Sequence, residues 1–116
     1  MPDSQKNLYK KLLGKKGETL AEQYLKKLGY KLLKKNYRTP FGEADLIFLD
    51  GDKTVFVEVK TRTSTAFGAA AEAVDYRKQQ RYRKIALYYG NGEEPNARFD
   101  VVEVYPDTIH HIPNAF

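Results

Sequence analysis

The 116-residue chain contains no cysteine. It therefore forms no disulfide bond, no zinc–thiolate site and no thiol nucleophile. No run of about 18 apolar residues is present, so a membrane-spanning helix is not expected. The charged N-terminal stretch lacks the apolar segment and cleavage site of a secretory signal. No glycine-rich phosphate loop and no Ser/His/Asp set is visible. These absences predict a soluble, cytoplasmic protein with no membrane partner.

The length predicts one domain, residues 1–116, which is long enough to bury a core without cross-links. We interpret residues 1–14 as a basic N-terminal segment and residues 106–116 as a C-terminal tail without a firm structural signal.

Charge is unevenly distributed along the chain, whose net charge is +5. Residues 1–40 carry 11 basic and 3 acidic side chains, whereas residues 41–76 carry 3 basic and 7 acidic ones. Residues 77–84 carry 5 basic side chains and no acidic one. Basic blocks attract a phosphate backbone, and an acidic centre repels it unless a cation lies there. Solvated lysine-rich faces explain the basic blocks equally well.

Hydrophobic spacing and turn signals predict the order helix, three strands, helix, strand, a mixed α/β fold around one sheet. The turns are expected at Thr39–Gly42 and Asp50–Lys53. The expected elements are a helix from about Lys15 with the apolar stripe Leu20, Ala21, Tyr24, Leu25 and Leu28, strands at Tyr30–Arg38, Glu43–Leu49 and Thr54–Arg62, a helix at Val74–Tyr89 and a strand at Arg98–Tyr105.

Three charged residues, Asp45, Glu58 and Lys60, lie within the second and third predicted strands. Side chains alternate along a strand, so Glu58 and Lys60 share one face. If the hairpin loop is residues 51–52, or has four residues, Asp45 lies opposite Glu58. If the loop is residues 50–51, Asp45 lies diagonal to Glu58. Both registers put the three side chains on one face, and only a three-residue loop with a bulge changes this.

Two facing carboxylates are destabilising unless something compensates their charge. In one interpretation, Lys60 or Arg62 neutralises them in a structural ion-pair network. In the other, Asp45 and Glu58 bind a hard divalent cation such as Mg²⁺. Lys60 then stabilises charge at a scissile phosphate or positions an attacking water.

The segments Gly42–Ile47 and Val57–Arg62 resemble the core of the PD-(D/E)XK nuclease superfamily. In that core an Asp precedes a hairpin and the next strand carries Glu-X-Lys. The matching residues here are Asp45, Glu58 and Lys60.

The upstream segment Gly17–Leu25 resembles the first helix of archaeal-type Holliday junction resolvases, with Glu18 eleven residues before Gly29. Over about residues 14–105 the chain is most similar to the YraN family of bacterial, endonuclease-like proteins. One departure is Ala44, which stands where the superfamily's name has Pro; it adds nothing in favour of activity.

The resemblance implies a restriction-endonuclease-like αβββαβ core and a metal-dependent endonuclease acting on DNA, with branched or junction DNA suggested by the first helix. Mg²⁺ is the implied cofactor and Mn²⁺ a substitute. Symmetric cutting of a junction implies a homodimer. The implied catalytic residues are Glu18, Asp45, Glu58 and Lys60, of which the three carboxylates bind the metal.

Glu18 also fits this role by its position on the first helix. At about 100° per residue it lies at the edge of the apolar face, beside Leu25, whereas Glu22 points further out. An ordinary N-terminal Glu favoured by the helix dipole is the alternative.

Basic side chains that contact nucleic acid are expected on both helices and beside the site. Lys78 falls on the apolar stripe of the second helix, and Arg62 shares a face with Lys60. Tyr37 and Tyr76 are candidates for stacking on unpaired bases, although aromatic residues near strands are more often core. The full set of expected nucleic-acid contacts is Arg62, Lys78, Arg81, Lys15, Lys16 and Arg38.

Two other function classes remain open. The first is a nucleic-acid-binding module that keeps the nuclease-like fold without cutting. The second is an adaptor that uses its basic face to bind a protein. The adjacent histidines at 110 and 111 are not expected to form a metal site.

Overall fold

The computed structural model describes residues 16–62, 75–90, 92 and 96–116. The predictions for Lys15 and for the basic segment 1–14 therefore lie outside the described residues. The N-terminal helix is described over residues 16–27 and ends as expected before Gly29, which has a φ of +96°. The other elements are β1 Lys31–Thr39, β2 Gly42–Asp50, β3 Lys53–Thr61, α2 Tyr76–Tyr89, β4 Ala97–Val104 and β5 Ile109–Ile112.

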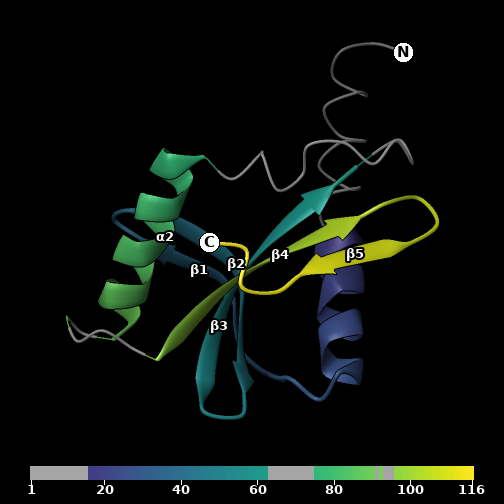
Figure 1. Ribbon diagram of the computed structural model, residues 1–116, viewed down its shortest axis with the longest axis horizontal. Coiled ribbons are helices and arrows are strands. Elements are labelled where there is room, and N and C mark those ends of the chain that lie inside the picture. The colour runs from purple at the N-terminus through teal and green to yellow at the C-terminus, as the bar shows by residue number, and fades with distance from the viewer. Residues whose placement is uncertain (1–15, 63–74, 91, 93–95) are drawn as a thin grey trace.

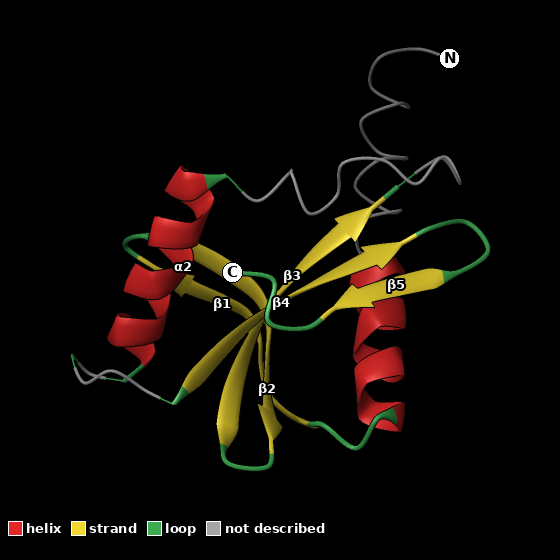
Figure 2. Ribbon diagram, viewed as in Figure 1, coloured by secondary structure: helices red, strands yellow, loops and turns green. Residues whose placement is uncertain are grey.

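The five strands form one mixed sheet in the order β1-β2-β3-β4-β5, with β3 and β4 parallel and the other pairs antiparallel. Figures 1 and 2 show the N-terminal helix and α2 on opposite sides of the strands. This mixed α/β arrangement confirms the predicted fold class and is consistent with a restriction-endonuclease-like core. In the described part of the chain, no helix is long and apolar enough to cross a bilayer.

Alternation along β3 divides the core into two layers. Val55 and Val57 pack with the N-terminal helix, whereas Phe56 packs with α2 and stacks on Phe99 at 5.7 Å between ring centroids. Because successive side chains of a strand point to opposite faces, both faces of β3 are buried. Leu28 was predicted on the buried stripe but is 50% exposed, because the helix has already ended before it.

The two edges of the sheet differ. The C-terminal tail, for which the sequence gives no firm signal, contributes β5 to one edge by pairing with β4. The other edge is β1, whose register with β2 shifts between Leu32 and Lys34. A bulge of this kind bends an edge strand locally.

A buried polar network joins β4 to the hairpin and to β5. The guanidinium of Arg98 donates to Asp100, to Asp50 Oδ2 at 2.7 Å and to the Tyr30 hydroxyl at 2.7 Å. Nε2 of His111 lies 2.7 Å from Asp100 Oδ2. Burial raises the pKa of Asp100, but the hydrogen bonds from His111, Arg98 and the Asn114 backbone outweigh it and hold that pKa below its usual value.

We expect Asp100→Asn to lower the free energy of unfolding at pH 7 by about 3 kcal/mol, since it leaves Arg98 without its buried counter-charge. A carboxyl with a depressed folded-state pKa stabilises the fold above its unfolded pKa and loses this contribution as the pH falls through the folded value. The difference between variant and wild type should therefore shrink below about pH 4. Urea unfolding at pH 7 and pH 3 measures it, with exposed Asp107→Asn as the control. An unchanged gap at both pH values would contradict the assignment.

Candidate active site

The β2–β3 hairpin turns at residues 51–52, where Gly51 has a φ of +61°. Asp50 pairs with Lys53, and the ladder continues as far as Leu46 with Val57. Continued by one step, this register would put Asp45 across from Glu58, and repulsion from Glu58 does raise the pKa of Asp45. The observed turn is thus one of those that predict directly facing carboxylates.

At that step the side chain of Asp45 replaces a backbone carbonyl of β2 as a hydrogen-bond acceptor. Its Oδ2 accepts the backbone N–H of Val59 at 2.8 Å. In a regular hairpin that N–H would donate to a carbonyl of β2. The two strands therefore part at Asp45, and the opening leaves room for the side chains of Glu58 and Lys60 on the side of α2.

Glu58 is the centre of a compact charge cluster. It is 8% exposed, and its Oε1 forms an ion pair with Lys78 of α2 and lies 3.9 Å from Nζ of Lys60. Its other oxygen, Oε2, is buried and has no hydrogen-bond partner among the described residues. A buried carboxylate oxygen without a partner is costly, so a ligand that hydrogen-bonds to or coordinates this atom would be stabilising.

The charges of the cluster perturb one another. Burial raises the pKa of Asp45 to about 6, with repulsion from Glu18, Glu58 and Glu43 adding to it and the Val59 N–H opposing it. Burial also lowers the pKa of Lys60; the adjacent Lys78 lowers it further and Glu58 opposes this. Such clustered perturbation is common at functional sites and also occurs in structural ion-pair networks.

Glu18 reaches this cluster because the N-terminal helix packs closely on β3. Gly17 is buried against Thr61, and a Cβ at position 17 would collide with Oγ1 of that threonine. The Asn36 amide, oriented to donate, reaches Oε1 of Glu43 at 2.9 Å and Oε2 of Glu18 at 3.2 Å. The acidic helix residue is therefore tied to the start of β2.

Sequence reasoning did not assign Asn36 and Glu43 to the site. Asn36 has a φ of +50°, unusual for a residue other than glycine, and asparagine is depleted in strands. An asparagine inside a predicted strand was the available signal for a special backbone position.

The predicted basic contacts divide into two groups. Lys78 lies at the acidic cluster. Arg62 lies at the end of β3, where its Nε is 3.5 Å from Oε2 of Glu103. Glu103 is buried and also accepts from the Tyr105 hydroxyl at 2.8 Å, while His110 Nδ1 lies 3.0 Å from its Oε1. This carboxylate, which sequence reasoning missed, orients Arg62.

Among the described residues, the remaining basic side chains form no ion pair with Asp45 or Glu58. Lys16 is exposed at the start of the described helix, and the Arg38 side chain is 86% exposed, with its Nε 3.8 Å from Glu43. Arg81 lies against the β1–β2 turn at Gly42. Of the two tyrosines considered for stacking, Tyr37 packs against Tyr89 in the core layer of α2. Tyr76 is 73% exposed.

The donor set bears on the expected metal. Asp45 and Glu58 offer only carboxylate oxygens, the ligands that Mg²⁺ prefers, and Oε2 of Glu58 lacks a partner within the described ranges. These residues therefore fit a hard divalent cation. Across the described residues, no three His, Cys, Asp or Glu side chains are arranged as a ready metal site.

Comparisons with known proteins agree on one family. The sequence profile described as "Uncharacterised protein family UPF0102" matches residues 17–104. A UPF0102 protein of Caldanaerobacter subterraneus is 48% identical, covering 96% of this chain and 99% of the relative. One of Thermodesulfovibrio yellowstonii is 51% identical, covering 90% and 95%. One of Alkaliphilus oremlandii is 49% identical, covering 91% and 98%. The names of these relatives state no activity.

We expect Gly17→Ala to displace the N-terminal helix, because its Cβ meets Oγ1 of Thr61. The cost should be about 1–3 kcal/mol, as for overpacking at other tight contacts. Thr61→Ala in the same chain removes the colliding oxygen and should restore most of the loss. Thermal unfolding of the two single variants and the double variant measures this coupling. Equal losses in Gly17→Ala with and without Thr61→Ala would contradict the close contact.

We expect Asp45→Asn to stabilise the protein at pH 8, because an amide keeps the acceptor for Val59 and removes the repelled charge. A carboxyl whose folded-state pKa is raised from 3.8 to about 6 destabilises the fold above that pKa by about 3 kcal/mol. The gain should vanish below about pH 4, where the carboxyl is protonated in both states. Melting curves at pH 8 and pH 4 test this, with Asp52→Asn in the exposed turn as the control. Destabilisation at pH 8 would refute it.

Proposed function

The chain belongs to the UPF0102 family, and from its acidic site we propose that it is a metal-dependent endonuclease that hydrolyses phosphodiester bonds in DNA. The observation that carries the proposal is the meeting of Asp45 and Glu58 where β2 and β3 part, with Lys60 beside them. The resemblance of these residues to the PD-(D/E)XK core supports the same activity.

In this proposal Asp45 and Glu58 bind Mg²⁺, or Mn²⁺ as a substitute, and Glu18 joins them directly or through water. When bound, the cation supplies an acidified water and positive charge that offsets the phosphate.

The chain's own residues complete the reaction. Lys60 is half-buried, and its lowered pKa suits Nζ to hold the attacking water and to take up or release its proton. Lys78, which is paired with Glu58, would be placed to contact a DNA phosphate beside that carboxylate. Arg62, oriented by Glu103, donates to a phosphate oxygen. The water oxygen bonds to phosphorus, one P–O bond breaks, and the leaving sugar oxygen takes up a proton.

A second candidate function has its own support. The ion pair of Glu58 with Lys78 neutralises the carboxylate without any metal. A site closed in this way suits a nucleic-acid-binding module that keeps the nuclease-like fold and does not cut. The two candidates share DNA as the ligand and differ in turnover.

The resemblance of the first helix to Holliday junction resolvases makes branched DNA the first substrate to test. A homodimer is proposed on the same ground, since two related cuts across a junction require two-fold symmetry. Recombination or repair in the cytoplasm is the corresponding setting.

We expect purified protein to cut a labelled four-way junction in Mg²⁺ or Mn²⁺ and not in EDTA. Asp45→Asn, Glu58→Gln and Lys60→Met should each reduce the cleavage rate by about 100-fold or more. Matched duplex and single-stranded DNA rank the substrates. Asp52→Asn in the hairpin turn and Lys53→Met at the first residue of β3 serve as charge-matched controls and should leave cleavage unchanged.

A second readout follows the metal itself. Mg²⁺ should raise the melting temperature of the wild type, because a ligand that binds only the folded state stabilises it, and should raise that of Asp45→Asn much less. DNA binding without cleavage in either metal, together with no metal-dependent melting shift, would favour the binding module.

A further inference from the structure

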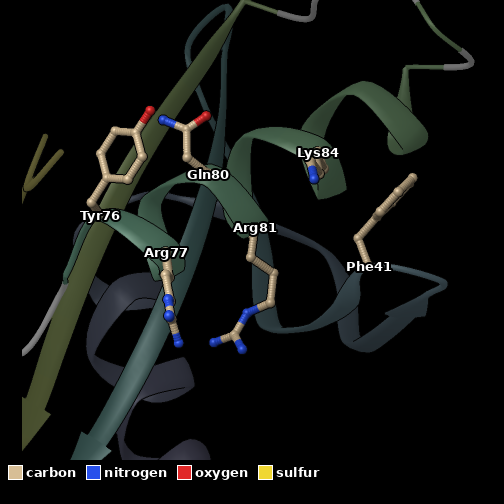
Figure 3. Close-up of a pocket in the computed structure, with 6 residues that line it drawn as sticks. All are labelled: Phe41, Tyr76, Arg77, Gln80, Arg81 and Lys84. Atoms are coloured by element: carbon tan, nitrogen blue, oxygen red, sulfur yellow. The ribbon is translucent and has the colours of Figure 1, made fainter.

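A groove with a volume of about 400 Å³ lies along α2 beside the β1–β2 turn (Figure 3). Among the described residues, its lining combines aromatic rings and cations and contains no acidic side chain. The lining residues are Phe41, Tyr76, Arg77, Gln80, Arg81 and Lys84.

The aromatic rings lie at the two ends of the groove. Figure 3 shows Tyr76 at one end and Phe41 at the other. Tyr76 is 73% exposed and Phe41 46% exposed, a large apolar exposure for side chains of this size. Exposed rings that frame one groove offer flat faces to a ligand with flat faces of its own.

The backbone of Tyr76 is fixed by a helix cap, and the ring of Phe41 is held by neighbouring side chains. Tyr76 is the first residue of α2, whose start is fixed by the Asp75 side chain accepting the Lys78 N–H at 2.9 Å. The ring of Phe41 lies 6.4 Å from that of Tyr88, and Nζ of Lys84 lies 5.8 Å from its centroid. A preorganised ring such as that of Phe41 loses little conformational entropy when it binds.

The cations lie between the rings. Arg77 and Arg81 are one helical turn apart, about 6 Å along the axis, and their guanidinium groups point the same way in Figure 3. The stem of Arg81 crosses Gly42, where a Cβ would lie 2.7 Å from its Cδ, so glycine at this turn leaves room for the arginine. Two guanidinium groups on one side suit successive negative charges on a chain.

The helix that lines the groove also carries a residue of the acidic cluster. Lys78, which pairs with Glu58, lies one turn before Arg81 on the same helix. A strand bound along Arg77 and Arg81 is thereby led to the place where β2 and β3 part.

We propose that this groove binds an unpaired segment of a DNA strand. Bases stack on Tyr76 and Phe41, and phosphates contact Arg77 and Arg81. Cationic side chains are enough to bind the phosphates of duplex DNA. The bases of a duplex are already stacked on one another, so exposed aromatic rings gain stacking contacts only from unpaired bases. The inference rests on the proposed function only in placing a scissile phosphate beside Glu58. It defines the substrate class as DNA with a single-stranded branch or end.

The binding test needs no cleavage. The natural chain has no tryptophan, so Tyr76→Trp introduces a single indole as a reporter at the groove. In EDTA, a single-stranded oligonucleotide should quench its fluorescence at concentrations about tenfold lower than those of a duplex of equal length. Lys31→Ala on β1 serves as a control for general charge loss.

Variants separate stacking from charge. By anisotropy in EDTA, Tyr76→Ala and Phe41→Ala should each weaken single-strand binding about tenfold and leave duplex binding unchanged, whereas Tyr76→Phe should bind normally. Arg77→Ala should weaken the binding of both single-stranded and duplex DNA and make that binding less dependent on salt. Circular dichroism melting verifies that each variant is folded.

The outcomes distinguish this inference from the nuclease. Equal affinity of Tyr76→Ala and wild type for the single strand, or no quenching in Tyr76→Trp, would overturn the groove assignment even if Asp45-dependent cleavage is observed. Stacking-dependent binding without any cleavage would uphold the groove and count against the nuclease. Competition by an acidic peptide with loss of DNA discrimination would assign the groove to a protein ligand and overturn the inference.

Discussion

The hydrogen bond from the Val59 N–H to the Asp45 carboxylate determines the architecture of the site. It satisfies a backbone donor that the β2–β3 ladder no longer serves. Because a side chain completes the pairing, the two strands separate without leaving an unpaired N–H. The separation gives Glu58 and Lys60 a position between sheet and helix, in a layer that is otherwise aromatic and aliphatic.

The remaining charges follow from that position. A carboxylate placed in an apolar layer requires counter-charge, and Lys78 from α2 supplies it. On the opposite face of the sheet, the buried carboxylate has hydrogen-bond partners for its oxygens. There Asp100 is fully buried, but Arg98, His111 and a backbone amide saturate it, which lowers its pKa. Asp45 instead has a raised pKa, and Oε2 of Glu58 has no hydrogen-bond partner among the described residues. In the proposed function, this contrast separates an acid that stabilises the fold from acids that bind a ligand.

The sequence sufficed for the N-terminal helix, α2 and strands β1 to β4, and for the shared face of Asp45, Glu58 and Lys60, because helical spacing, alternation along strands and the Gly51 turn are local signals. It was insufficient wherever a contact depends on the tertiary arrangement. The pairing of the tail as β5 requires β4 as a template, and the partnership of Glu103 with Arg62 crosses two parallel strands. The bridge from Asn36 to Glu18 joins elements that no spacing rule relates. Leu28 matched the helical period but lies beyond the helix end.

The exposed edge strand β1 has a further consequence for self-association. An open edge with unpaired backbone groups invites pairing with another chain, and natural sheets prevent it with lysines and bulges. β1 carries Lys31, Lys34, Lys35 and Arg38, and its register shifts at Leu32. Two copies brought edge to edge would oppose these like charges along an irregular strand. The edge thus protects the protein against aggregation through β1, and a two-fold partner would have to meet it on another surface.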